Sequence, residues 1–171
     1  MATSPFDHIP LPEAFADDPR LVDGRQSAHA LAVQRGVGRL MAGFGFSVVT
    51  ELVLASGRRA DVTALGPKGE IWIVEIKSSV EDFRTDRKWP DYRDYCDRLF
   101  FATHTQVPLD IFPEEAGLIL ADSFGAEVMR EAPDHRLSSA ARKAVTLRFA
   151  HAAARRFHGL IDPAARDGLA I

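Results

Sequence analysis

The chain has 171 residues, of which 46% are hydrophobic and 26% charged, and its formal net charge is −3. This composition is typical of a soluble globular protein of ordinary size and excludes an intrinsically disordered chain. The slight negative charge excludes a protein coated in basic residues, although a local basic groove for nucleic acid is compatible with it.

Cys96 is the only cysteine, which excludes a disulfide framework and a cysteine-based zinc site. The sequence lacks an apolar run of about 18 residues, the length that a transmembrane helix needs. It also lacks a basic start followed by an apolar segment, the pattern of a signal peptide. We therefore expect a cytoplasmic protein with no membrane partner.

The N-terminal residues 1–22 contain several prolines and no clear periodicity, which predicts an extended arm. Residues 23–171 are expected to form a single domain. Its first element is a helix that begins at Asp23, where Gln26 completes a capping-box pattern, and that ends at Gly43.

Two glycines inside this helix, Gly36 and Gly38, weaken an isolated helix. We therefore expect tertiary packing to stabilise it, for instance by a close approach to a sheet.

Three strand-like segments follow, at 46–54, 59–66 and 70–79, and all are rich in β-branched and apolar residues. The short turns between them predict an antiparallel β-meander. Residues 80–98 are polar and helical in parts, and Pro90 is typical of the first turn of a fresh helix.

The rest of the chain predicts further strands at 99–103, 116–122 and 125–133, then a long C-terminal helix capped by Ser138 or Ser139. The predicted order is α-β-β-β-α-β-β-β-α. We expect an α/β fold in which a central mixed sheet, with the antiparallel meander in it, is flanked by helices.

Charged residues interrupt the apolar pattern of the last two meander strands. A hairpin loop of Pro67, Lys68 and Gly69 places Asp61 directly opposite Glu75, with their Cβ atoms roughly 5 Å apart. Lys77 then points to the same face, opposite Arg59.

Two carboxylates at this separation repel each other unless a cation lies between them. Mg²⁺ fits, because it prefers oxygen ligands and keeps several waters. Lys77 could position a water or stabilise charge that develops on a phosphate. The pattern therefore predicts metal-assisted phosphodiester hydrolysis. The alternative is that these charges form the solvent end of a strand, with Asp61 paired to Arg59 or Lys77.

This arrangement, with Asp61 and a Glu-x-Lys triplet in a meander behind a helix, resembles the PD-(D/E)XK nuclease superfamily. More narrowly, "RRADVTA…EIWIVEIKSSVEDFRTDRKWPDYRDYCDRLFFA" resembles the MmcB-like family of bacterial DNA repair proteins, over roughly residues 24–160. The resemblance implies a restriction-endonuclease-like core. It also implies that Asp61 and Glu75 bind Mg²⁺ (or Mn²⁺) and that Lys77 is the catalytic lysine.

Many members of that superfamily place a glutamate on the first helix as another metal ligand, but residues 25–43 contain no acid. His29, Gln26 or Gln34 would have to substitute, with His29 as the ligand and the two glutamines beside it. Otherwise the metal would bind the two carboxylates, the Ile76 carbonyl and water.

DNA contacts are predicted beside the hairpin, where Arg59, Arg84, Lys88 and Tyr92 offer positive charge and an aromatic ring. Lys88 and Tyr92 are four residues apart, so they share one face of an α-helix. A basic and aromatic surface of this kind suits nucleic acid. The alternative is that the aromatic residues pack this helix onto the sheet, which we expect for Trp89.

The C-terminal helix could extend the DNA-contacting surface through a basic cluster of Arg142, Lys143, Arg148, Arg155 and Arg156. For His151 and His158 on the same helix, we expect an ordinary solvated face. Cys96 with His104 suggests a thiol nucleophile, but no third group orients them, so we expect a buried structural cysteine.

Together these patterns predict a DNA repair-associated, metal-dependent nuclease that acts on DNA. The alternative is an inactive protein of the same fold that binds DNA or a repair partner. Many nucleases of this class act as dimers, so a homodimer is compatible with the resemblance.

Overall fold

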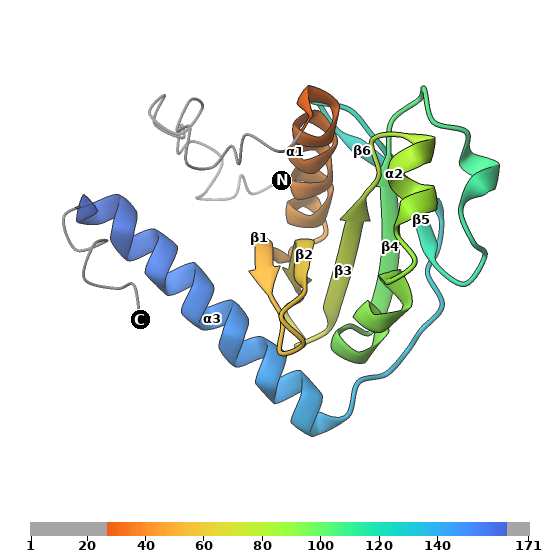
Figure 1. The fold of residues 1–171 in the computed structure, drawn as a ribbon. Coiled ribbons are helices and arrows are strands. Elements are labelled where there is room, and N and C mark those ends of the chain that lie inside the picture. The colour runs from red at the N-terminus through yellow and green to blue at the C-terminus, as the bar shows by residue number, and fades with distance from the viewer. Residues whose placement is uncertain (1–26, 164–171) are drawn as a thin grey trace, which may run out of the picture.

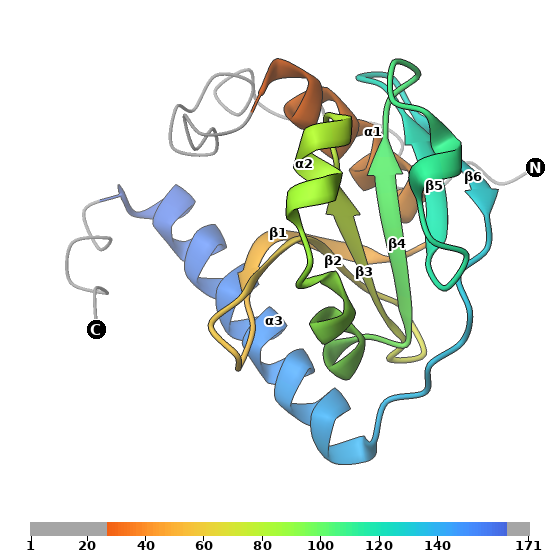
Figure 2. The same ribbon diagram turned by 45° about the vertical axis from the view of Figure 1, so that its right-hand side comes forward.

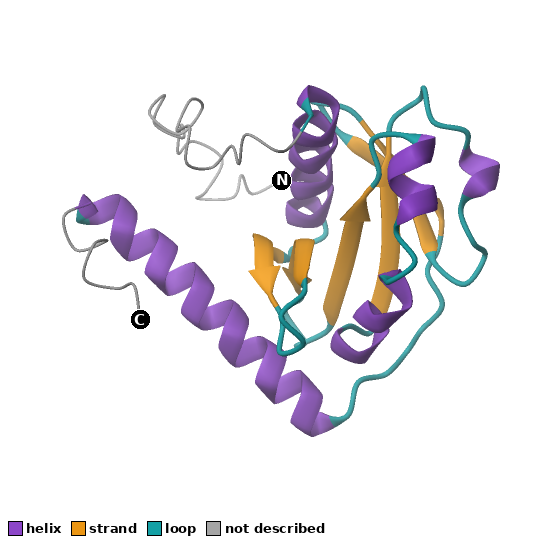
Figure 3. Ribbon diagram, viewed as in Figure 1, coloured by secondary structure: helices purple, strands orange, loops and turns teal. Residues whose placement is uncertain are grey.

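The computed structural model describes residues 27–163, which form one six-stranded sheet with helices on both faces (Figures 1 and 3). The predicted N-terminal arm and the predicted capping residues Asp23 and Gln26 lie outside the described residues. The strands are β1 (Ser47–Val53), β2 (Arg59–Leu65), β3 (Ile71–Ile76), β4 (Arg98–Thr103), β5 (Gly117–Ala121) and β6 (Ala126–Arg130). The helices are α1 (Ala28–Gly43), α2 (Val80–Thr85) and α3 (Ser139–Ile161), with 3₁₀ helices η2 (Trp89–Tyr95) and η3 (Leu109–Ile111).

The strands lie in the order β1-β2-β3-β4-β5-β6. The first three pair antiparallel, β4 pairs parallel with both β3 and β5, and β6 returns antiparallel along β5. The predicted mixed sheet with an antiparallel meander and the predicted order of elements are thus confirmed. The helix expected at Pro90 is a 3₁₀ helix, a difference that matters for the site.

The first helix begins later than the capping box predicts. Ser27 is its N-cap, and the Ser27 hydroxyl accepts a hydrogen bond from the Ala30 amide at 3.1 Å. The helix ends where predicted, and Gly45 beyond it adopts φ +80°. A left-handed residue at this position is the usual way to end a helix, and glycine adopts it without strain.

Gly36 confirms the expected close approach. A Cβ atom at this position would lie 2.3 Å from the carbonyl oxygens of both Asp122 and Gly125, in the turn between β5 and β6. A Cβ at Gly38 would meet nothing within 4 Å. Of these two glycines of α1, only Gly36 is therefore required by packing.

The sheet separates two apolar layers. On one face, α1 packs Val33 and Val37 against strand residues such as Val62, Val74 and Phe100. On the other, Ile71 and Ile73 pack with residues of η2 and α3. Because side chains alternate along a strand, Glu75 shares the face of Ile71 and Ile73 and lies on the η2 side.

A buried aspartate fixes the start of α3. The Asp97 carboxylate accepts hydrogen bonds from the amides of Ile71 (2.8 Å) and Leu137 (3.1 Å), and Arg142 donates to both of its oxygens at 2.6 Å. These bonds and the Arg142 charge outweigh the effect of burial and lower the Asp97 pKa. From this point α3 runs along the β1 side of the sheet (Figures 1 and 2). No helix within residues 27–163 is long and apolar enough to cross a membrane.

Candidate active site

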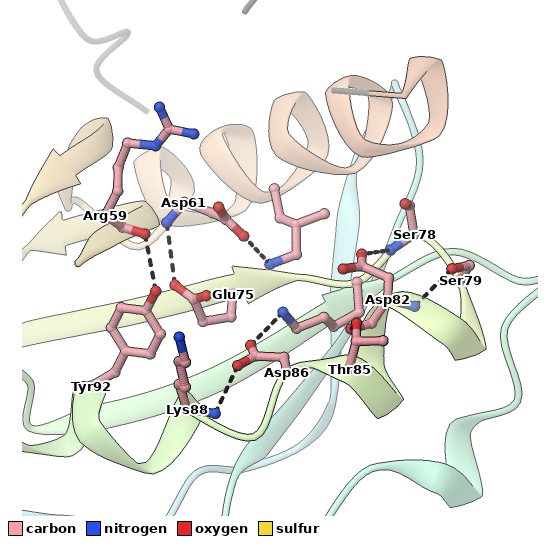
Figure 4. A network of polar contacts seen from close by, with 12 residues as sticks. Arg59, Asp61, Glu75, Ser78, Ser79, Asp82, Thr85, Asp86, Lys88 and Tyr92 are labelled. Atoms are coloured by element: carbon pink, nitrogen blue, oxygen red, sulfur yellow. Dashed lines mark hydrogen bonds and ion pairs between the residues drawn. The ribbon is translucent and has the colours of Figure 1, made fainter. Parts of the chain in front are cut away.

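The predicted hairpin register is confirmed. Val62 pairs with Val74 and Leu65 with Ile71, so the next pair along the hairpin is Asp61 and Glu75. The loop of Pro67, Lys68 and Gly69 is closed by a hydrogen bond from the Gly66 amide to the Glu70 carbonyl at 2.8 Å, and Gly69 adopts φ +84°. Asp61 and Glu75 therefore lie side by side at the end of β3 (Figure 4).

Strands β2 and β3 diverge at this point, so the regular backbone hydrogen bonds between them stop. The acidic side chains bind the backbone amides in their place. The Ile76 amide donates to Asp61 Oδ2 at 2.7 Å, and the Asp61 amide donates to Glu75 Oε1 at 3.3 Å. The N–H and C=O of one strand residue point to the same edge, so the Ile76 carbonyl also faces this opening. Each carboxylate uses one oxygen on the backbone and has a second oxygen for another partner.

A cavity of about 510 Å³ opens over these groups. Its walls come from the ends of β2 and β3, from α2 and η2, and from the first turn of α1. Asp61, Glu75, Ile76 and Lys77 all line it, together with Arg59. The structure thus brings the predicted catalytic residues into one concave site.

Both carboxylates titrate far from their ordinary range. Burial, and then the charge of Glu51, raise the Asp61 pKa to about 6, although the Ile76 amide and Lys77 act in the opposite direction. Burial and the neighbouring Asp61 charge raise the Glu75 pKa well above its usual value, and Glu75 is only 3% exposed. Two acids that resist ionising together form a site where a bound cation would be favourable.

Lys77 is held as a cation by a residue that the sequence patterns did not single out. Its Nζ lies 2.6 Å from Asp86 Oδ2, and the side chains are 7% and 19% exposed. Burial alone would lower the Lys77 pKa, but the hydrogen bond and charge of Asp86 outweigh it, so the pKa rises. Lys77 is therefore fully protonated near neutral pH and supplies a fixed positive charge beside Glu75.

The start of α2 adds a second carboxylate that the sequence reasoning missed. Ser79 caps this helix by accepting from the Asp82 amide at 3.0 Å, while the Asp82 carboxylate accepts from the Ser78 amide at 3.0 Å. The spacing Ser-x-x-Asp at 79–82 is a capping-box pattern and could have located this turn. Asp86 follows one helical turn after Asp82, so both acids line the cavity.

The predicted basic and aromatic surface needs correction. Tyr92 is buried in the 3₁₀ helix η2, and its hydroxyl donates to the Arg59 carbonyl at 3.0 Å. It borders the cavity but does not share an α-helical face with Lys88, which is the N-cap of η2. Arg84 and Lys88 are exposed, as DNA contacts would require, and Trp89 packs against Phe101, as expected for a core residue.

The first helix does not place its predicted substitutes in the cavity. His29 is exposed and stacks on His104 with ring centroids 4.6 Å apart, and neither His29 nor Gln34 lines the cavity. Gln26 lies outside the described residues. At the start of α1, the residues that line the cavity are instead Ser27 and Ala30. Within residues 27–163, no three His, Cys, Asp or Glu side chains are grouped closely enough to form a metal-binding cluster.

Two other expectations are settled by burial and pairing. Burial raises the Cys96 pKa to about 12, and its thiol donates to the Tyr92 carbonyl at 3.4 Å, so Cys96 is a structural cysteine. Arg59 lines the cavity and forms an ion pair with Glu51 on the neighbouring strand.

Comparison with known proteins identifies relatives that match most of the chain. The family model described as DNA repair protein MmcB-like matches residues 17–164. Among solved structures, the SPO1766 protein of unknown function from Silicibacter pomeroyi is 45% identical in sequence, with a TM-score of 0.78. The match covers 81% of this chain and 94% of that chain. No curated protein matches the chain.

Proposed function

The chain belongs to the MmcB-like family of DNA repair proteins, and from that premise we propose that it is a divalent-metal-dependent nuclease that hydrolyses DNA phosphodiester bonds. The observation that carries the proposal is the side-by-side placement of two carboxylates, the half-buried Asp61 and the buried Glu75, next to the protonated Lys77 in one open cavity.

The residues present fit a hard divalent cation of the Mg²⁺ type. Such an ion is commonly bound through one or two protein carboxylates plus substrate phosphates, and not by an all-protein cage. Asp61 and Glu75 would hold it, with the Ile76 carbonyl facing the same opening. When bound, Mg²⁺ or Mn²⁺ supplies positive charge that polarises a phosphoryl oxygen.

The side chains around this position have separate roles. Asp61 and Glu75 orient each other through the 3.3 Å hydrogen bond from the Asp61 amide. Lys77 presents its ammonium group to negative charge that grows on the phosphate in the transition state, which is the kind of electrostatic stabilisation that contributes most to catalysis. Asp86 keeps that ammonium group protonated and in place, so Asp86 is a positioning residue and Lys77 the catalytic one.

Cleavage of labelled DNA with Mg²⁺ or Mn²⁺ tests this proposal. Lys77→Ala and Glu75→Gln should each lower the cleavage rate by about 100-fold or more, while the exposed Lys143→Ala, distant in sequence from the cavity, should match the wild type. Glu75→Gln keeps the shape of the side chain, and circular dichroism checks that both site variants are folded. Wild-type rates in both site variants would refute the assignment.

A second candidate function is DNA binding without cleavage. It is favoured by the first helix, which brings Ser27 and Ala30, not an acid, to the cavity. This function predicts that the wild type binds DNA equally well with EDTA or Mg²⁺ and never cleaves it. A metal-dependent product that disappears in Glu75→Gln would exclude it.

A further inference from the structure

The C-terminal helix α3 has a charge pattern unlike the rest of the chain. None of its 23 residues is acidic, although the chain as a whole has a net charge of −3. Its basic residues are Arg142, Lys143, Arg148, Arg155 and Arg156. A helix with only positive charges in an acidic protein is an electrostatic feature that calls for a partner.

The structure divides these basic residues by what they contact. Arg142 is paired with Asp97, and Arg156 donates to the Thr50 carbonyl at 2.6 Å, so both hold α3 against the body. Arg148 and Arg155 are exposed, and no hydrogen bond or ion pair with another residue of the described range 27–163 engages them. Their charges remain available to a ligand.

Arg148 and Arg155 line a groove of about 340 Å³ between α3 and β1, with His151 between them. At 3.6 residues per turn they lie on one face, about 20° apart around the axis and about 10 Å apart along it. One DNA strand carries a phosphate every 3.4 Å along the duplex axis, so this span corresponds to about three phosphates. Lys143 is about 140° around the helix from Arg148, on a different face.

This groove is linked to the active site. Glu51 on β1 lines the groove and forms an ion pair with Arg59, which lines the catalytic cavity. Glu51 is the only acid that lines the groove among the described residues, and Arg59 balances its charge. Neighbouring strands are about 4.8 Å apart, so β1 lies about 10 Å from the Glu75 strand. A DNA strand in the cavity therefore reaches the groove within a few nucleotides.

We propose that the groove between α3 and β1 binds the phosphodiester backbone of DNA next to the cleaved bond, through Arg148 and Arg155. This inference deepens the proposed function and rests on it. The two guanidinium groups bind phosphates without reading bases, so they set the position of the DNA and not its sequence preference.

Equilibrium binding of a fluorescein-labelled DNA duplex of arbitrary sequence to the full chain tests the proposal. The titrations are made in EDTA, so that no cleavage interferes, and at salt concentrations between about 50 and 200 mM. The variants are Arg148→Ala/Arg155→Ala and, as a control that removes the same charge away from the groove, Lys143→Ala/Lys68→Ala. Lys143 lies on another face of α3, and Lys68 lies in the loop between β2 and β3. Circular dichroism confirms that each variant is folded.

Each phosphate contact contributes about 0.9 to the slope of log K against log salt. Removing two contacts should therefore reduce the magnitude of this slope by about 1.8. The wild type should then lose about tenfold more affinity than the double arginine variant over this salt range. The control, which loses the same amount of charge, should keep the wild-type slope. An unchanged slope in the arginine variant, or an equal loss in the control, would overturn the proposal.

The same set of proteins separates this inference from the proposed function. If the wild type never cleaves DNA but the slopes differ as expected, the nuclease proposal is wrong, and only the binding of DNA phosphates by the groove stands. If cleavage occurs and the slopes are equal, the proposed DNA binding by the groove is wrong and the nuclease proposal stands. If the wild type does not bind the duplex, the proposal that the groove binds DNA is also overturned.

Discussion

Replacing Asp61 by asparagine should stabilise the protein at neutral pH and not at acidic pH. The Asp61 pKa lies at about 6 in the folded protein against an ordinary value of 3.8. At about 1.4 kcal/mol for each pKa unit, this difference corresponds to about 3 kcal/mol of folding free energy. Asparagine cannot ionise, yet its side-chain oxygen can still accept the hydrogen bond from the Ile76 amide.

The sign follows from proton binding. A carboxyl group with a raised pKa binds its proton more tightly in the folded state than in the unfolded state, so stability falls as pH rises from about 4 to about 6. Asp61→Asn should therefore match the wild type below about pH 4 and exceed it by about 3 kcal/mol above about pH 6.

Urea denaturation in EDTA at about pH 4 and about pH 8 measures the difference, provided that the m-value is unchanged. The exposed Asp94 serves as the control, and Asp94→Asn should change stability little at either pH. A variant Asp61→Asn that is less stable than the wild type at the higher pH, or equally stable at both, would refute the reasoning. In that case the ionised Asp61 carboxylate would stabilise the folded protein, and its charge would not be retained for binding a ligand.

Three further variants test the surroundings of the site. Lys77→Met should lower the free energy of unfolding by about 3 kcal/mol because Asp86 loses its partner, and adding Asp86→Asn should restore most of it, as chemical denaturation would report. Gly36→Ala should lower the free energy of unfolding by more than about 3 kcal/mol, since its Cβ meets two backbone carbonyls. Gly38→Ala should stabilise α1 by up to about 1 kcal/mol. Equal melting temperatures of the two variants would contradict this. Tyr92→Phe should cost about 1 kcal/mol through the lost bond to the Arg59 carbonyl, and no change in the denaturation midpoint would show that this bond is dispensable.

The register of the catalytic hairpin could be predicted from sequence because only local geometry decides it. A short loop that ends on a glycine with positive φ leaves one way to pair β2 with β3, and Asp61 must then face Glu75. The order of elements was predictable for the same reason, because it depends on apolar periodicity and turn residues along the chain.

The contacts between elements could not be predicted in this way. The pairing of Lys77 with Asp86 depends on where α2 comes to rest, and the stacking of His29 on His104 joins residues that no short-range pattern connects. The prediction that Lys88 and Tyr92 share one face of an α-helix was wrong, because the chain forms a 3₁₀ helix there. Their predicted contacts with DNA stay a prediction.

Calorimetric titration of Mn²⁺ into the full chain at about pH 6 tests the central claim most directly. Because Asp61 is half protonated near that pH and metal ligands must be deprotonated, binding should release protons. The observed heat should then differ between two buffers of different ionisation enthalpy. We predict a single Mn²⁺ ion bound with proton release, and loss of this binding in Asp61→Asn and Glu75→Gln. No heat of binding in the wild type, or the same heat in both variants, would contradict a metal site at these carboxylates.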